Sequence, residues 1–135
     1  MRKYTVLPLL LLAVSFLAIN CSKKDSTPPN YDGNWSGTTS QGKTFSFTVS
    51  GNKVTAININ YTLSGNCSPS PSGESITFSG GNTISGNSFS LTGSSTAFSG
   101  TFSSGNAATG TFDVNFTGNP PGCSSTGSGT WSATK

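Results

Sequence analysis

Apolar and polar residues alternate with a period of two along most of the chain after residue 33. Alternation over four to eight residues predicts strands with one face buried and the other face in water. No stretch of this part shows the 3.6-residue period of an amphipathic helix. The segments expected to form strands are residues 34–39, 43–50, 53–64, 74–79, 82–85, 87–93, 96–104, 107–117 and 127–134, with 82–85 as a short extra piece. The pattern therefore predicts an all-β domain.

Three short turns separate these segments and predict how the strands pair. The turns are Ser50-Gly51-Asn52-Lys53, Ser85-Gly86-Asn87-Ser88 and Ser103-Ser104-Gly105-Asn106. Gly and Asn tolerate the positive φ of tight hairpins, so the strands on either side of each turn are expected to be antiparallel neighbours. The first and last strands both carry Trp and Gly, and we expect them to pair, because closure removes exposed sheet edges. The expected architecture is an antiparallel up-and-down β-barrel of about eight strands, with a two-sheet β-sandwich as the alternative.

The first twenty residues have a different character. Arg2 and Lys3 precede an apolar run over residues 6–19, and the chain becomes polar from Ser22 onward. These are the marks of a secretory signal, and the run is shorter than the roughly 20 residues that span a bilayer. The sequence thus divides into a signal peptide (1–20), a flexible tether (21–32) and an antiparallel β-domain (33–135).

The end of the signal points to lipidation. Leu17-Ala18-Ile19-Asn20-Cys21 resembles the lipobox of bacterial lipoproteins, although Asn20 stands where Gly, Ala or Ser is usual. The resemblance implies that Cys21 carries palmitate-type acyl chains, which anchor a protein stably when several are present. It also implies a lipid-anchored location in the cell envelope. Ser22, rather than Asp, follows the cysteine, which under the sorting rule of enteric bacteria favours the outer membrane, on its periplasmic face or at the cell surface. The alternative is an ordinary signal peptide with a coincidental cysteine, but no small-x-small cleavage site precedes Cys21.

Composition excludes some partners. After the signal, five Lys stand against four acidic residues, so no basic patch is available for nucleic acid. The chain holds 25 Ser, 19 Thr and 17 Gly, a composition that also occurs in disordered proteins. The strict apolar alternation opposes that interpretation.

Cys67 and Cys123 remain for a disulfide if Cys21 is lipidated. Both lie in Pro-, Ser- and Gly-rich stretches, and two cysteines in an oxidising compartment predict one bridge. The alternative is a reactive or metal-binding pair of thiols, and no His supports it.

Candidate chemistry is scarce. The chain has no His, which removes Ser-His-Asp and Cys-His arrangements and most zinc sites. Glu74 and Asp113 could form a glycosidase-like pair of carboxylates. However, Glu74 is expected in a loop and Asp113 on the solvated face of a strand. We therefore expect no enzyme, no cofactor and no metal.

The aromatic residues have two interpretations. The inward rings either fill the core or line a calyx for one small ligand, as eight-stranded barrels allow. Tyr31, Trp35 and Trp131 are the candidate ligand-binding residues, as platforms for a sugar or a protein. Trp35 and Trp131 also fit paired core positions, whereas Tyr31 precedes the β-domain and is expected to be exposed.

The arrangement resembles the small lipocalin- and streptavidin-like β-barrels over residues 33–134. The shared features are short hairpins, the opening Gly33-Asn34-Trp35-Ser36-Gly37 and the closing Gly129-Thr130-Trp131-Ser132-Ala133. The lipocalin cross-barrel arginine is absent, because Arg2 is the only Arg. The expected function is a non-catalytic envelope module that binds a protein, a glycan or a small apolar ligand. The alternative is a structural coat protein of the surface with no discrete ligand site.

Overall fold

The computed structural model describes residues 27–67, 73–118 and 121–135, with residues 73–80 described as backbone only. The described residues form nine strands and no helix. The strands are β1 (Gly33–Thr39), β2 (Thr44–Ser50), β3 (Lys53–Asn60), β4 (Ser64–Gly65), β5 (Gly73–Thr83), β6 (Ser88–Thr92), β7 (Thr96–Ser104), β8 (Ala107–Thr117) and β9 (Ser124–Thr134).

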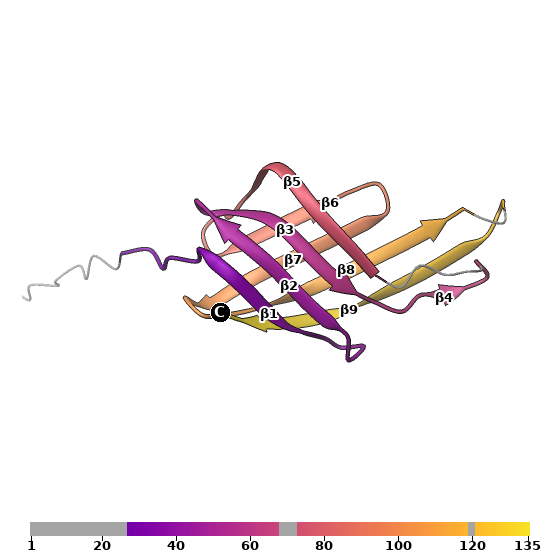
Figure 1. The fold of residues 1–135 in the computed structure, drawn as a ribbon, viewed down its shortest axis with the longest axis horizontal. Helices are drawn as coiled ribbons and strands as arrows, with labels where there is room; N and C mark the ends of the chain where they lie inside the picture. Colours follow the sequence, from indigo (N-terminus) through magenta and orange to yellow (C-terminus); the bar gives the residue numbers. More distant parts are fainter. Residues whose placement is uncertain (1–26, 68–72, 119–120) are drawn as a thin grey trace, which may run out of the picture.

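Eight of these strands form one antiparallel sheet in the order β5-β3-β2-β1-β9-β8-β7-β6, and β4 pairs with β9 beside it. In Figure 1, β1, β2, β3 and β5 slope one way, while β6 to β9 slope the other way. The sheet thus curls into a nearly closed barrel whose seam lies between β5 and β6. The all-β antiparallel barrel predicted from the sequence is confirmed.

The pairing of the first and last strands is also confirmed. Gly37 of β1 lies opposite Ala133 of β9, and Thr39 lies opposite Trp131. Gly37 is required here because a Cβ at this position would lie 1.8 Å from the Ser132 carbonyl oxygen. This pairing joins the two halves of the sheet, so the hydrogen bonds between β1 and β9 replace two free edges.

Two of the three predicted turns join strands that pair with each other, and the third does not. Gly51 and Asn52 both have positive φ, 58° and 59°, which is the geometry of a type I′ hairpin between β2 and β3. The turn at residues 103–106 joins β7 to β8, which pair along their length. The turn at residues 85–88 differs from the prediction: it closes with a single bridge between Ser85 and Ser88, and β5 and β6 then separate. The seam of the barrel begins at this turn.

Three predicted strand boundaries were wrong. The segment 53–64 ends as β3 at Asn60, and the short β4 follows at Ser64–Gly65. Residues 74–79 and the first half of 82–85 belong to one strand, β5, which ends at Thr83 and carries Gly81 at φ 69° where its register with β3 shifts. The last strand begins at Ser124 rather than 127, because β4 and β8 both offer it hydrogen-bonding partners there.

Aromatic rings from both halves of the sheet meet inside the barrel. Phe47 packs near the centre, with ring centroids between 5.3 and 6.1 Å from those of Trp35, Phe89, Phe102 and Trp131. Trp131 also stacks on Phe45 at 4.5 Å. Because aromatic pairs at these separations attract beyond the area they bury, the contacts fasten β1 and β2 to β6, β7 and β9.

Candidate functional site

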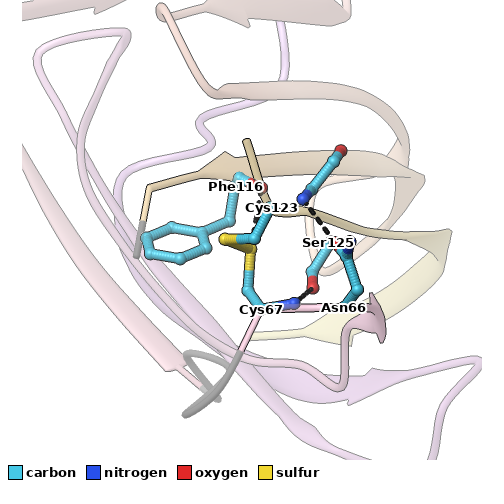
Figure 2. Close-up of a disulfide and its surroundings, with 6 residues drawn as sticks. Asn66, Cys67, Phe116, Cys123 and Ser125 are labelled. Atoms are coloured by element: carbon cyan, nitrogen blue, oxygen red, sulfur yellow. Dashed lines mark hydrogen bonds between the residues drawn. A yellow bond between two sulfur atoms is a disulfide. The ribbon is translucent and has the colours of Figure 1, made fainter. Parts of the chain in front are cut away.

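The disulfide predicted between Cys67 and Cys123 is confirmed. Their sulfur atoms are bonded at 2.06 Å, across 56 positions of sequence (Figure 2). The bond joins the chain just after β4 to the chain just before β9. Because the two sulfurs are bonded to each other, the alternative of a reactive or metal-binding thiol pair does not hold in this structure.

Hydrogen bonds surround the disulfide and extend its hold on β9. The Cys67 amide donates to Ser125 Oγ at 3.2 Å, and the Ser124 amide donates to Asn66 Oδ1 at 2.7 Å (Figure 2). The Asn66 amide returns a bond to the Ser124 carbonyl at 3.1 Å. Ser125 is fully buried, so its hydroxyl satisfies a backbone donor that would otherwise be costly to bury. This cluster is structural in character.

The expectation that Tyr31 is exposed was wrong. Its side chain is 6% exposed, and its ring stacks on Phe102 with centroids 4.1 Å apart. The Tyr31 carbonyl accepts a hydrogen bond from Trp35 Nε1 at 2.9 Å. The buried ring and the hydrogen bond from the indole N–H together hold the segment before β1 against the barrel. Tyr31 is therefore not available as a surface platform.

Trp35 and Trp131 are core residues, with 1% and 2% of their side chains exposed. Each stacks on a different phenylalanine of β2: Trp35 on Phe47 and Trp131 on Phe45. All three aromatic residues that the sequence suggested as ligand contacts thus have their rings in the interior. These contacts favour a filled core over a calyx, because the rings pack on one another.

The outer face of the sheet, rather than the interior, carries the depressions that could hold a ligand. An open depression of about 580 Å³ lies over β1, β9, β8 and β7. Hydroxyl side chains dominate its lining, and the described residues that line it carry no charge. The lining residues are Thr38, Thr39, Ser40, Ser99, Thr101, Thr109, Gly110, Thr111, Thr130, Trp131 and Ser132.

A second depression of about 370 Å³ adjoins the first and shares Ser99 and Thr111 with it. It extends along the same outer face toward Ser90 of β6 and Ser128 of β9. Asp113 is the one charged residue that lines it within the described part of the chain. As the sequence predicted, Asp113 is exposed between the buried Phe112 and Val114. We call the two depressions together the hydroxyl groove.

Sheet register assembles the hydroxyl groove from strands that are far apart in sequence. Thr109 of β8 lies opposite Thr101 of β7 and Ser132 of β9. Two residues further along β8, Thr111 lies opposite Ser99 and Thr130. Two rows of hydroxyls therefore cross the sheet, each row at right angles to the strands.

Glycines on the inward positions let Trp131 lie beneath these rows. A Cβ on Gly110 would lie 2.4 Å from the Trp131 ring and 1.8 Å from the Ser99 carbonyl oxygen. A Cβ on Gly100 would lie 2.8 Å from the same ring. The indole in turn donates from Nε1 to the Thr111 carbonyl at 3.2 Å. The core thus supports the backbone that carries the outer hydroxyls.

The hydroxyl groove offers hydrogen-bonding groups. The chain has no His to serve as a base beside one of its hydroxyls, and Asp113 is the one carboxylate among the described residues that line it. Among the described residues no cluster of three metal-ligating side chains is present. Glu74 falls on β5 rather than in a loop, and its side chain lies outside the described residues, so the pair with Asp113 has no geometry here.

The sequence predicts a solvated face for the outward Ser and Thr and does not predict the groove. The signal was the repeated hydroxyl-x-hydroxyl pattern at Ser99/Thr101, Thr109/Thr111 and Thr130/Ser132. Only the register between strands decides that these pairs are neighbours. Cys21, the expected lipidation site, lies outside the described residues.

Residues 27–67, 73–118 and 121–135 contain no helix that is long and apolar enough to cross a membrane. No known protein family, curated protein or solved structure matches the chain.

Proposed function

We propose that this chain is an exported, non-catalytic envelope protein, anchored through lipid on Cys21, that binds a polar ligand on its outer face. The observation that carries the binding role is the hydroxyl groove, in which two depressions adjoin on one face of the barrel. The proposed anchor rests on the signal peptide and on the lipobox-like residues 17–21 at its end. The outer-membrane location is part of the proposal and rests on Ser22, rather than Asp, after the cysteine.

The position of the N-terminal segment is compatible with such an anchor. Residues 27–30 are exposed and precede β1, at the end of the barrel where Lys135 also lies (Figure 1). Lys135 Nζ donates to the carbonyls of Asn30 and Asp32 at 2.9 and 3.0 Å. The disulfide lies at the opposite end of the barrel. A tether attached at the Asn30 end would display the disulfide end away from the membrane.

Three ligand classes were open, and the packing favours a polar one. A small apolar ligand would need space among the rings that surround Phe47. A protein partner is usually held by exposed Trp, Tyr or Arg, but both Trp are buried and no Arg follows Arg2. The surface that remains consists of hydroxyls, and these suit a ligand with many hydrogen-bonding groups.

The coat function is a second candidate, favoured by the outward hydroxyls of the other half of the sheet. Ser36 of β1 and Ser46 of β2, for example, are directly opposite each other. Thr48 Oγ1 donates to Asn34 Oδ1 at 3.1 Å on the same outer side. A polar cover that continues around the barrel would serve a coat without any discrete site.

The anchor is tested with the protein purified from its native membrane. Intact mass spectrometry should give the chain from Cys21 onward with added acyl mass, and Cys21→Ser should lose both that mass and the membrane association. An unacylated wild-type chain would overturn the anchor.

The binding role is tested with the same preparation in nanodiscs. A Thr111→Arg variant, which fills the centre of the groove, is compared with Thr126→Arg, which lies on β9 outside it. Loss of a bound polar ligand in the first variant alone supports the binding role. A panel of glycans and peptides that never distinguishes the two variants favours the coat.

A further inference from the structure

We infer that the hydroxyl groove recognises a neutral polysaccharide whose chain lies between the two rows of hydroxyls. This inference rests on the proposed binding function and names its ligand class. It depends on the charge of the lining, on exposed hydroxyls without a protein partner in the described part of the chain, and on the register that aligns the rows.

The charge of the lining excludes an anionic chain. No Lys or Arg is among the described residues that line either depression, and Asp113 contributes a carboxylate. An acidic polysaccharide would find no ion pair and would meet one like charge. A neutral chain loses nothing by this, because the Asp113 carboxylate accepts hydrogen bonds from sugar hydroxyls.

Some hydroxyls of the first depression already have partners: Thr39 Oγ1 accepts from the Lys43 amide, and Ser40 Oγ accepts from the Thr130 amide. Ser99 Oγ and Thr111 Oγ1 are hydrogen-bonded to each other at 2.8 Å. Within the described part of the chain, the hydroxyls of Thr101, Thr109 and Thr130 have no protein partner. A hydroxyl donates one hydrogen bond and accepts two, which is also the capacity of each hydroxyl of a sugar. Donors and acceptors therefore need no fixed pattern to match.

The rows suit a chain rather than a single sugar. Neighbouring strands lie about 4.8 Å apart, and residues two apart on one strand are separated by about 6.8 Å. The row through Thr109 and the row through Thr111 therefore form a strip that crosses β7, β8 and β9. A linear polymer laid along this strip meets hydroxyls on both sides at each strand that it crosses.

Each of these hydrogen bonds is weak, so binding has to be measured with many copies of the protein together. A hydrogen bond between neutral groups adds little net binding free energy, because it replaces hydrogen bonds to water, so one short oligosaccharide binds weakly to one copy. Many copies anchored in one membrane convert weak sites into strong attachment of a long polymer. The ligand is thus expected to be a polysaccharide gripped by several anchored copies together.

The test uses the mature lipidated protein in phosphatidylcholine liposomes, which present many copies. The probes are dextran, mixed-linkage β-glucan, polygalacturonate and a poly-lysine peptide, and co-sedimentation measures their retention. At least one neutral glucan should be retained at least tenfold more than by protein-free liposomes. Polygalacturonate should remain at the level of those liposomes.

A triple variant, Thr109→Val, Thr111→Val and Thr130→Val, removes the hydroxyls but keeps the β-branched shape that favours strands. The matched control is Thr117→Val, Thr126→Val and Thr134→Val, on exposed positions of β8 and β9 outside the groove. The groove triple should lose the neutral glucan at least tenfold, and the control triple less than twofold. Near-UV circular dichroism checks that both remain folded.

Equal retention of glucan by both triples, or retention of neither glucan by the wild type, would overturn the inference. Retention of poly-lysine or polygalacturonate that only the groove triple loses would also overturn it. In that case the binding function stands and its ligand class is different.

Discussion

The ring of Tyr31 lies on the ring of Phe102, with centroids 4.1 Å apart and planes inclined by 17°. Tyr31 precedes β1, and Phe102 lies on β7 across the barrel. Tyr31 lies within residues 21–32, which were predicted to be a flexible tether, so the contact fastens the end of that segment to the half of the sheet that carries the hydroxyl groove. A pull on the N-terminus would be transmitted to the core through this stack.

Removal of the Tyr31 ring should destabilise the fold. Truncation of a buried aromatic side chain usually costs about 3–5 kcal/mol, and we expect Tyr31→Ala to cost about 3 kcal/mol because the residue lies at the end of the barrel. Tyr31→Phe keeps the stack and should change the free energy of unfolding by less than about 1 kcal/mol. Urea unfolding of both variants decides the matter. A Tyr31→Ala protein as stable as wild type would show that the stack carries no stability.

The disulfide should contribute a large part of the stability. On the chain-entropy model, a bridge over 56 positions contributes about 4 kcal/mol by restricting the unfolded chain. Cys67→Ala, Cys123→Ala and the double variant should all lose the same amount, because each breaks the same bond. Guanidinium unfolding measures the losses. Additive losses in the double variant would contradict a single shared bond.

Gly110 should not tolerate a side chain. Gly110→Ala places a methyl group against the Ser99 carbonyl and the Trp131 ring, and overpacking of this kind costs about 3 kcal/mol. The matched control is Gly105→Ala, where the nearest atom to a new Cβ is the Asn30 carbonyl oxygen at 4.0 Å. That substitution should leave stability unchanged or raise it by up to about 1 kcal/mol. Thermal unfolding and tryptophan fluorescence compare the two, and equal effects would count against the close packing at Gly110.

Lys135 should hold the N-terminal segment in place. Its Nζ donates to two carbonyls of that segment and lies 5.4 Å from the centroid of the Trp35 ring. Lys135→Met should speed proteolytic cleavage within residues 27–32 several-fold while global stability changes less than in Tyr31→Ala. Mass mapping of the fragments locates the cleavage. Lys43→Met, at an exposed position on another part of the surface, serves as the control and should cleave at the wild-type rate.

The sequence predicted the class of fold and much of its order. Alternation places Phe45, Phe47 and Val49 on one face of a strand wherever that strand lies, because successive side chains point to opposite faces. The Gly51-Asn52 turn likewise forces β2 and β3 together, since both residues adopt positive φ. The two cysteines left for a bridge after Cys21 predicted the disulfide. These features are local, or they follow from counting.

The predictions were wrong where contacts between residues distant in sequence decide burial or strand pairing. Tyr31 lies outside the alternating pattern, and its burial follows from the stack of its ring on Phe102 and from the hydrogen bond that Trp35 Nε1 donates to its carbonyl. Likewise, the turn at residues 85–88 has the composition of a hairpin, but β5 pairs with β3 and not with β6. Local preference permits both arrangements, and the curvature of the whole sheet selects one.

The sequence by itself therefore determined the strand faces, most of the turns, the disulfide and the polar character of the exterior. Only the tertiary structure decided where the barrel has its seam, that Tyr31 belongs to the core and that the hydroxyls form a groove. The physical reason is register: Thr101, Thr109 and Ser132 become neighbours only when β7, β8 and β9 pair at one alignment. A shift by one residue would turn those hydroxyls inward and the aromatic rings outward, so the buried rings specify the alignment that builds the groove.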